Sequence, residues 1–132
     1  MSIELQTLGY SALLGLLQIV LASHAASFQR GYHWTAGARE GAVSPLTGWA
    51  NALARASGNF LETFPFFAAL VLAAHVANRE GLLTFYGVQL YFWARLAYVP
   101  LYRVQLVRSL VWNVATAGII LVAAALLWPV GQ

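Results

Sequence analysis

Four long apolar stretches, each interrupted by only a few polar residues, dominate the pattern of the chain. They cover about residues 5–28, 47–77, 82–103 and 106–128, and each reaches the roughly 20 residues that a helix needs to cross a bilayer core. The only long connection, residues 29–46, is rich in glycine, serine and alanine. The pattern predicts an all-α integral membrane protein, a four-transmembrane-helix bundle forming a single domain over residues 1–132.

The composition narrows the class of protein further. Of the 132 residues, 61% are hydrophobic and only 8% are charged, with a mean hydropathy of +0.70. Soluble domains carry roughly a quarter charged residues, so an ordinary soluble domain, a disordered chain and a nucleic-acid binder are all excluded. The chain has no cysteine. Any thiol chemistry therefore needs a sulfur that the substrate brings.

The arginines predict the orientation in the membrane. With four crossings the first and third loops share one side, and these loops and their borders hold four arginines: Arg30, Arg39, Arg103 and Arg108. The other side holds only Arg79, next to Glu80. Because basic residues favour cytoplasmic loops, we expect these two loops inside and both termini outside. We expect the first stretch to be retained rather than cleaved as a signal peptide, since Glu4 replaces the usual basic start.

Two polar stripes meet at the expected cytoplasmic side. On the second helix, Arg55, Asn59 and Glu62 are spaced i, i+4, i+7 and so share one face. On the third helix, four residues at i, i+4, i+7 and i+11 share another face: Tyr91, Arg95, Tyr98 and Tyr102. Consecutive helices run in opposite directions, so both stripes reach the same depth. Arg108 and Ser109 follow just beyond the third loop.

The charges of this cluster indicate a ligand with carboxylates and an amine. Several arginines face a single glutamate, which suits anionic groups together with one ammonium. A structural alternative stays open, in which Glu62 forms a buried ion pair with Arg55 or Arg95 and only holds helices together. The three histidines, His24, His33 and His75, have no metal-ligand spacing, so we expect no metal.

Two blocks of sequence resemble the MAPEG family, the membrane-associated proteins in eicosanoid and glutathione metabolism. RASGNFLETFPFFAAL contains the family's second-helix signature as Arg55, Asn59, Glu62 and Pro65. ARLAYVPLYRVQLVRSLVW is similar to the second block, with four residues at or near the family spacing: Arg95, Tyr98, Tyr102 and Arg108. The similarity is strongest to small bacterial members, which implies a bacterial inner membrane.

The resemblance implies a homotrimer that binds glutathione between adjacent protomers, open to the cytoplasm. By residue-by-residue transfer, the groups that hold glutathione are Arg55, Asn59, Glu62, Arg95, Tyr98 and Tyr102. Arg108 is the candidate catalytic residue that stabilises the thiolate, and Arg103 is the alternative because the third loop is short. Ser109 is a candidate second hydrogen-bonding group.

The expected function is that of a membrane-embedded glutathione transferase or peroxidase for lipophilic electrophiles, active in detoxification. Glutathione is then the co-substrate, and the other partners are the lipophilic second substrate, the lipid bilayer and two further copies of the chain. The rival from another class is a non-enzymatic membrane scaffold or interaction protein that uses the same polar cluster structurally. A small transporter ranks last, because no inverted repeat or pair of broken helices is visible. The sequence does not specify the second substrate.

Overall fold

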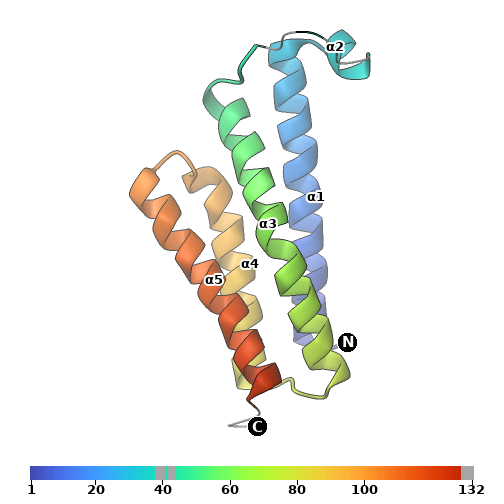
Figure 1. Ribbon diagram of the computed structural model, residues 1–132, viewed down its shortest axis with the longest axis vertical. Coiled ribbons are helices and arrows are strands. Elements are labelled where there is room, and N and C mark those ends of the chain that lie inside the picture. Colours follow the sequence, from blue (N-terminus) through green and yellow to red (C-terminus); the bar gives the residue numbers. More distant parts are fainter. Residues whose placement is uncertain (38–40, 42–43, 129–132) are drawn as a thin grey trace.

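The computed structural model describes residues 1–37, 41 and 44–128, and every regular element in that part of the chain is helical. Four helices are long and one is short: α1 (Ile3–Arg30), α2 (Tyr32–Ala36), α3 (Gly48–Val76), α4 (Leu82–Leu101) and α5 (Gln105–Leu127). The predicted ends of the long helices lie within two residues of the observed ones. The long helices run alternately up and down (Figure 1), so the N-terminus, the α3–α4 turn and the end of α5 share one end.

Three of the long helices, α1, α3 and α5, are long and apolar enough to cross a membrane. The fourth, α4, has 20 residues but is less apolar, because it contains Gln89, Arg95 and three tyrosines: Tyr86, Tyr91 and Tyr98. An all-helical fold with three such helices is the architecture of an integral membrane protein.

The short helix α2 was not expected from the sequence, which predicted a loop for residues 29–46. It sits across the end of α1, where Ser27 and Thr35 share a hydrogen bond of 2.9 Å between their hydroxyls. Gln29 bonds the backbone of Thr47 through both its amide atoms, and Arg30 donates to the Ser44 carbonyl. Arg39, used to predict the orientation, lies outside the described residues.

The helices form two closely packed pairs, α1 with α3 and α4 with α5. Glycine permits the closest approach, at Gly87 of α4 and Gly118 of α5, where a Cβ on Gly87 would lie 2.7 Å from the Gly118 carbonyl oxygen. In the first pair, Gly15 lies against the ring of Phe60. Small residues at these crossings let the backbones come together, as in other membrane bundles.

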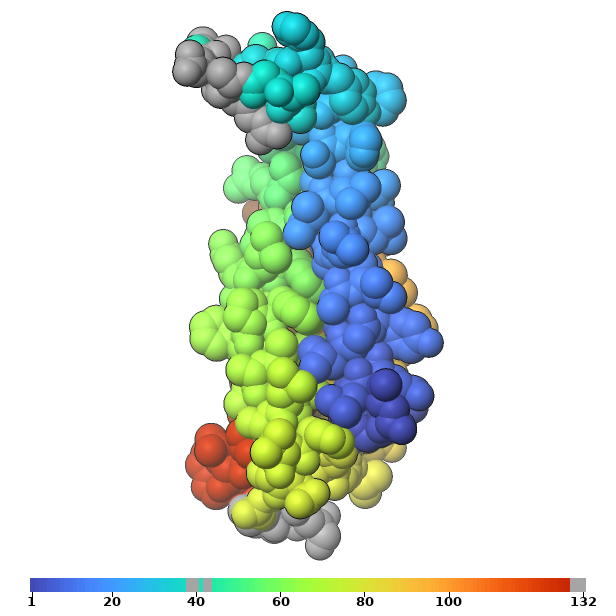
Figure 2. Space-filling view, turned by 90° about the vertical axis from the view of Figure 1, so that its right-hand side faces the viewer, coloured from blue at the N-terminus to red at the C-terminus, as the bar shows by residue number. Residues whose placement is uncertain are grey.

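Large apolar side chains cover much of the outer surface as well as the core. Figure 2 shows α1 and α3 side by side along an elongated face, with α2 at one end. The outward positions of α1 include several exposed residues: Leu13, Leu16, Leu17, Val20 and Leu21. Such a continuous apolar surface is unsuited to water and suits lipid or another protein chain.

Candidate functional site

The second-helix stripe lines a pocket at the α3–α4 interface, in the half of the molecule that contains the α4–α5 turn. Its volume is about 330 Å³, and its lining is Arg55, Gly58, Asn59, Glu62 and Tyr102. Four of these residues are predicted site residues, and the exception is Gly58. The i, i+4, i+7 spacing places the three charged or amide groups on one side of α3, and Tyr102 approaches from the end of α4.

A second polar pocket adjoins the first and shares Asn59 with it. This pocket has a volume of about 250 Å³ and is lined by Asn59, Tyr98, Arg108, Ser109, Trp112 and Asn113. Three helices contribute, because Asn59 comes from α3, Tyr98 from α4 and the other four from α5. The structure therefore brings residues of both stripes, distant in sequence, to two adjoining pockets.

Arg95 lies beneath these pockets and lines neither of them. Its side chain is completely buried, and it donates to Asn59 Oδ1 at 2.8 Å and to the Ala56 carbonyl at 3.5 Å. Its guanidinium also sits 4.1 Å from the centre of the Tyr98 ring. Arg95 was predicted to hold glutathione directly; the structure places it behind Asn59, which lines both pockets, and behind Tyr98, which lines the second.

The bond from Arg95 fixes which way the Asn59 amide points. An arginine only donates, so the atom that it meets at 2.8 Å must be the Asn59 carbonyl oxygen. The NH₂ group is then turned away from Arg95. Asn59 lines both pockets, and its carbonyl oxygen is occupied by Arg95.

Arg108 reaches back from the first turn of α5 toward the end of α4. It donates to the Tyr102 carbonyl at 3.3 Å and lies 4.7 Å from the centre of the Tyr102 ring. This contact uses one of its five N–H groups, so most of its donors remain for a ligand. Arg103, the alternative, is exposed, stacks on Trp49 and lines neither pocket. The geometry favours Arg108 over Arg103.

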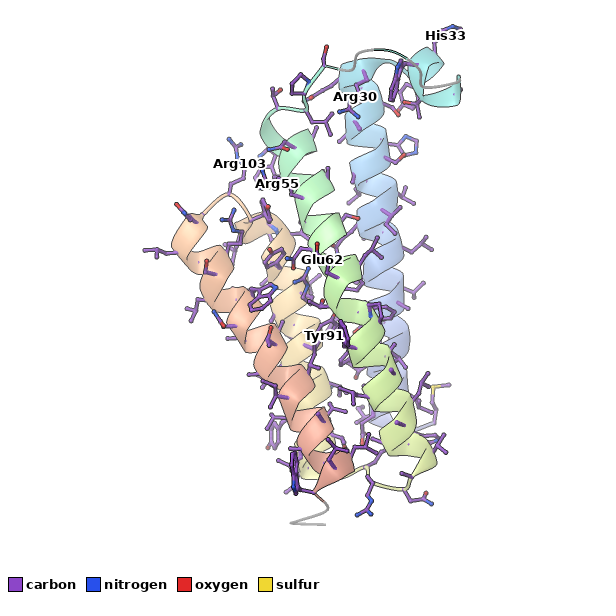
Figure 3. All side chains as sticks on the ribbon, viewed as in Figure 1. Arg30, His33, Arg55, Glu62, Tyr91 and Arg103 are labelled. Atoms are coloured by element: carbon purple, nitrogen blue, oxygen red, sulfur yellow. The ribbon has the colours of Figure 1, made fainter. Side chains whose placement is uncertain are left out.

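Glu62 and Arg55 have no ion-pair or hydrogen-bond partner in the described part of the chain. The alternative of a structural ion pair between Glu62 and Arg55 or Arg95 is therefore not what the folded chain forms. Figure 3 shows Arg55 near Arg103 and the α4–α5 turn, with Glu62 further along α3 toward the middle of the molecule. Both charges are exposed on the isolated chain.

Tyr91 belongs to the third-helix stripe with Arg95 and Tyr98, but its side chain packs in the hydrophobic core. It is fully buried, stacks on Phe67 with ring centres 3.9 Å apart, and shares a 3.0 Å hydrogen bond with Thr63. The sequence analysis did not identify Trp112 or Asn113 as pocket residues. The signal was present, because 108, 109, 112 and 113 fall on one face of a helix.

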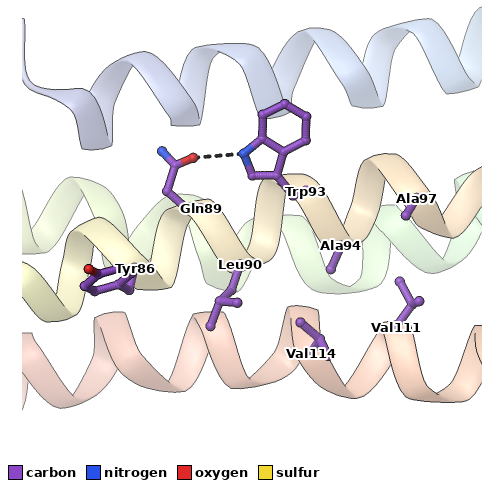
Figure 4. A pocket seen from close by; sticks show the side chains of 8 residues that line it. All are labelled: Tyr86, Gln89, Leu90, Trp93, Ala94, Ala97, Val111 and Val114. Carbon is purple, nitrogen blue, oxygen red and sulfur yellow. Dashed lines mark hydrogen bonds between the residues drawn. The ribbon is translucent and has the colours of Figure 1, made fainter.

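A third pocket, of about 360 Å³, lies between α4 and α5 and contains none of the predicted site residues. Figure 4 shows its mainly apolar lining and the hydrogen bond from Trp93 to Gln89, 2.9 Å long. Within the described residues no group of three or more metal-ligating side chains gathers anywhere.

Comparison with known proteins finds one relationship. The chain matches the MAPEG family over residues 7–128, which is nearly its whole length. No curated protein and no solved structure matches it.

Proposed function

The chain belongs to the MAPEG family, and on that basis we propose that it binds glutathione and transfers it to lipophilic electrophiles or uses it to reduce lipophilic peroxides. The observation that supports this most strongly is the pair of adjoining polar pockets. One contains unpaired charges of both signs, and the other contains Arg108. A peptide that carries carboxylates, an amine and a thiol can place its charged ends in the first pocket and its thiol in the second.

The charged pocket suits the two ends of the peptide. A glutamate without an internal partner favours an ammonium, and an arginine without one favours a carboxylate. Keeping Arg55 and Glu62 unpaired has a cost at membrane depth, which a complementary ligand or a neighbouring chain offsets. Asn59 and Tyr102 add hydrogen bonds between these charges and the second pocket.

The second pocket suits the sulfur. A free thiol has a pKa of about 8.5, so only a few per cent of it is thiolate at neutral pH. The guanidinium of Arg108 keeps its charge at all relevant pH values and stabilises a thiolate placed within hydrogen-bond reach. The thiolate is the nucleophile that attacks the electrophile. Tyr98, Ser109, Trp112 and Asn59 line the same pocket and can supply neutral hydrogen bonds.

The proposed assembly is a trimer of four-helix chains in the bacterial inner membrane, with the pockets facing the cytoplasm. α4 is the fourth crossing in this proposal, because its polar residues Gln89 and Arg95 are hydrogen-bonded inside the chain, which lowers the cost of insertion. Exposure of Arg55 and Glu62 on one chain supports a site completed by a neighbour. The bilayer would supply the lipophilic second substrate.

Calorimetry on the purified protein in detergent tests the proposal, with glutathione and with an analogue that has a methyl group in place of the thiol. We expect both to bind, and only glutathione to show the ultraviolet absorbance of a thiolate. Aryl halides, epoxides and lipid hydroperoxides then serve as second substrates. Absence of glutathione binding at millimolar ligand would end the enzyme hypothesis. Loss of the trimer in Glu62→Ala, with or without glutathione, would favour the scaffold instead.

A further inference from the structure

The polar groups of the Arg108 pocket are mostly hydrogen-bond donors. Arg108 and the Trp112 indole only donate, and the Asn59 carbonyl oxygen is already taken by Arg95, which leaves its NH₂ group as the polar atom without that partner. Tyr98 and Ser109 have hydroxyl groups, which can donate or accept. A thiolate and a carbonyl oxygen both match this set, because both accept hydrogen bonds. Asn113 is the exception among the lining residues.

The amide of Asn113 is fixed in the opposite sense to that of Asn59. Its Nδ2 donates to the Ser109 carbonyl, one turn earlier in α5, at 2.9 Å. A carbonyl only accepts, so the atom facing it must be the nitrogen. The carboxamide oxygen then points away from that carbonyl, and it has no partner among the described residues. Asn113 is exposed and lines the pocket, so this oxygen is a fixed acceptor beside a group of donors.

This arrangement rests on the proposed function, because it concerns the substrate that meets the thiolate. We propose that Asn113 makes the site selective for lipophilic electrophiles that carry a hydrogen-bond donor next to the reacting carbon, as hydroxyalkenals do. The donors around Arg108 hold the sulfur and the aldehyde oxygen, while the Asn113 oxygen accepts from the hydroxyl group. An alkenal without the hydroxyl group would leave the Asn113 oxygen without a hydrogen bond. We therefore expect the site to bind that alkenal less well than the hydroxyalkenal.

The reaction with such a substrate is an addition. The glutathione sulfur forms a bond to the β-carbon of the alkenal, and the π electrons of the double bond move toward the aldehyde as an enolate. The α-carbon then takes a proton, so the product contains both substrates and nothing leaves. The developing negative charge on the aldehyde oxygen faces donors such as Ser109 and Arg108, which is the arrangement that stabilises it.

The decisive comparison uses nonenal and hydroxynonenal, which differ only in the hydroxyl next to the double bond. Their kcat/KM values with saturating glutathione are each divided by the rate of the uncatalysed reaction in the same detergent, which removes the difference in intrinsic reactivity. We expect the wild-type protein to prefer hydroxynonenal by roughly three- to tenfold, the contribution of one hydrogen bond. The preference should disappear in Asn113→Leu and Asn113→Ala.

Thr116→Val is the matched control. Thr116 lies one turn further along α5, makes the same kind of bond to the carbonyl four residues earlier, and lines neither polar pocket. The Thr116→Val protein should prefer hydroxynonenal over nonenal to the same degree as the wild type. Equal normalised rates in the wild type, a preference that survives in both apolar variants, or turnover of neither aldehyde by protein that binds glutathione would overturn the inference. If the protein does not bind glutathione at all, the proposed function itself is wrong, and with it the inference that depends on it.

Discussion

The two ends of the bundle treat their ionisable groups in opposite ways. At the end with the termini, Glu4 is buried and accepts from Thr84 at 2.9 Å, and Glu80 accepts from Ser2 at 2.9 Å and lies 3.1 Å from His75. In the half of the bundle that contains the α4–α5 turn, Glu62 and Arg55 have no ion-pair or hydrogen-bond partner in the described chain. The carboxylates of the first end hold α1, α3 and α4 together, whereas the charges of the second end are open to something outside the chain.

This difference separates structural polar groups from candidates for binding. A buried carboxylate with its own donor contributes to folding, and its removal leaves that donor unpaired. A charge that the fold leaves without a partner contributes little to folding of the single chain, and a bound ligand or a second chain can pair with it. The comparison therefore predicts that substitutions at one end change stability and that substitutions at the other change binding.

The largest effect should follow from Arg108→Leu. Loss of the guanidinium removes the charge proposed to stabilise the thiolate, while the pocket that holds the peptide is unchanged. We expect kcat to fall by about 10²–10³-fold, with the glutathione Kd within a factor of about three and no thiolate absorbance. Stopped-flow absorbance and calorimetry measure these quantities. Arg103→Leu is the matched control, and a larger loss there would transfer the role to Arg103.

Glu62→Gln and Arg55→Gln should come next. Each removes a charge that is unpaired in the described chain, so we expect the glutathione Kd to rise by about 10- to 100-fold, as for a charged hydrogen bond. The unfolding temperature of the ligand-free protein should stay the same. Glu80→Gln, at the other end, controls for a general loss of charge. If Glu62→Gln unfolds the ligand-free protein, the charge is structural and the comparison fails.

Arg95→Met should weaken glutathione binding although Arg95 lines neither pocket. Methionine fills most of the space but cannot hold the Asn59 carbonyl oxygen, so the Asn59 amide loses its fixed orientation. We expect glutathione to bind roughly three- to tenfold more weakly. In the double variant Asn59→Ala, Arg95→Met, the second change should add nothing, because the two residues act as a unit. Full additivity of the two losses in calorimetry would show that Arg95 acts separately.

Glu4→Ala tests the opposite end. It removes one of the two acceptors of the Thr84 hydroxyl, the one that ties α1 to α4 at this point, so we expect the free energy of unfolding to fall by about 1 kcal/mol. Glutathione affinity and turnover should match those of the wild type. Unfolding in detergent followed by circular dichroism, together with calorimetry on the same sample, checks both parts. Reduced affinity in a folded Glu4→Ala protein contradicts the division between the two ends.

His75→Ala should have the smallest effect. The side chain of His75 is 43% exposed, and exposed ion pairs contribute little because water screens them. We expect a change of less than about 0.5 kcal/mol in the free energy of unfolding and none in binding. The same unfolding experiment measures it, with Ser2→Ala on the other side of Glu80 for comparison. A loss as large as that of Glu4→Ala would mean that the His75–Glu80 pair is shielded from water in the membrane-bound protein.

The class of fold, the long helices and the family could all be predicted from the amino-acid sequence. Apolar stretches of this length have few stable arrangements other than helices in a bilayer, so their positions could be predicted closely. The family predicted from the two blocks is confirmed by the match over residues 7–128. The helical spacing of Arg55, Asn59 and Glu62 also placed them correctly on one face.

Which polar residues line a pocket and which face the core became visible only in the folded chain. Tyr91, Arg95 and Tyr98 share one stripe, yet Tyr91 bonds Thr63, Arg95 lies beneath Asn59, and only Tyr98 lines a pocket. The orientation of the Asn113 amide was equally invisible in the sequence. Spacing along a helix specifies direction around one axis, whereas burial and hydrogen bonding depend on how a second helix packs against it, and here α3 supplies the partners of both Tyr91 and Arg95.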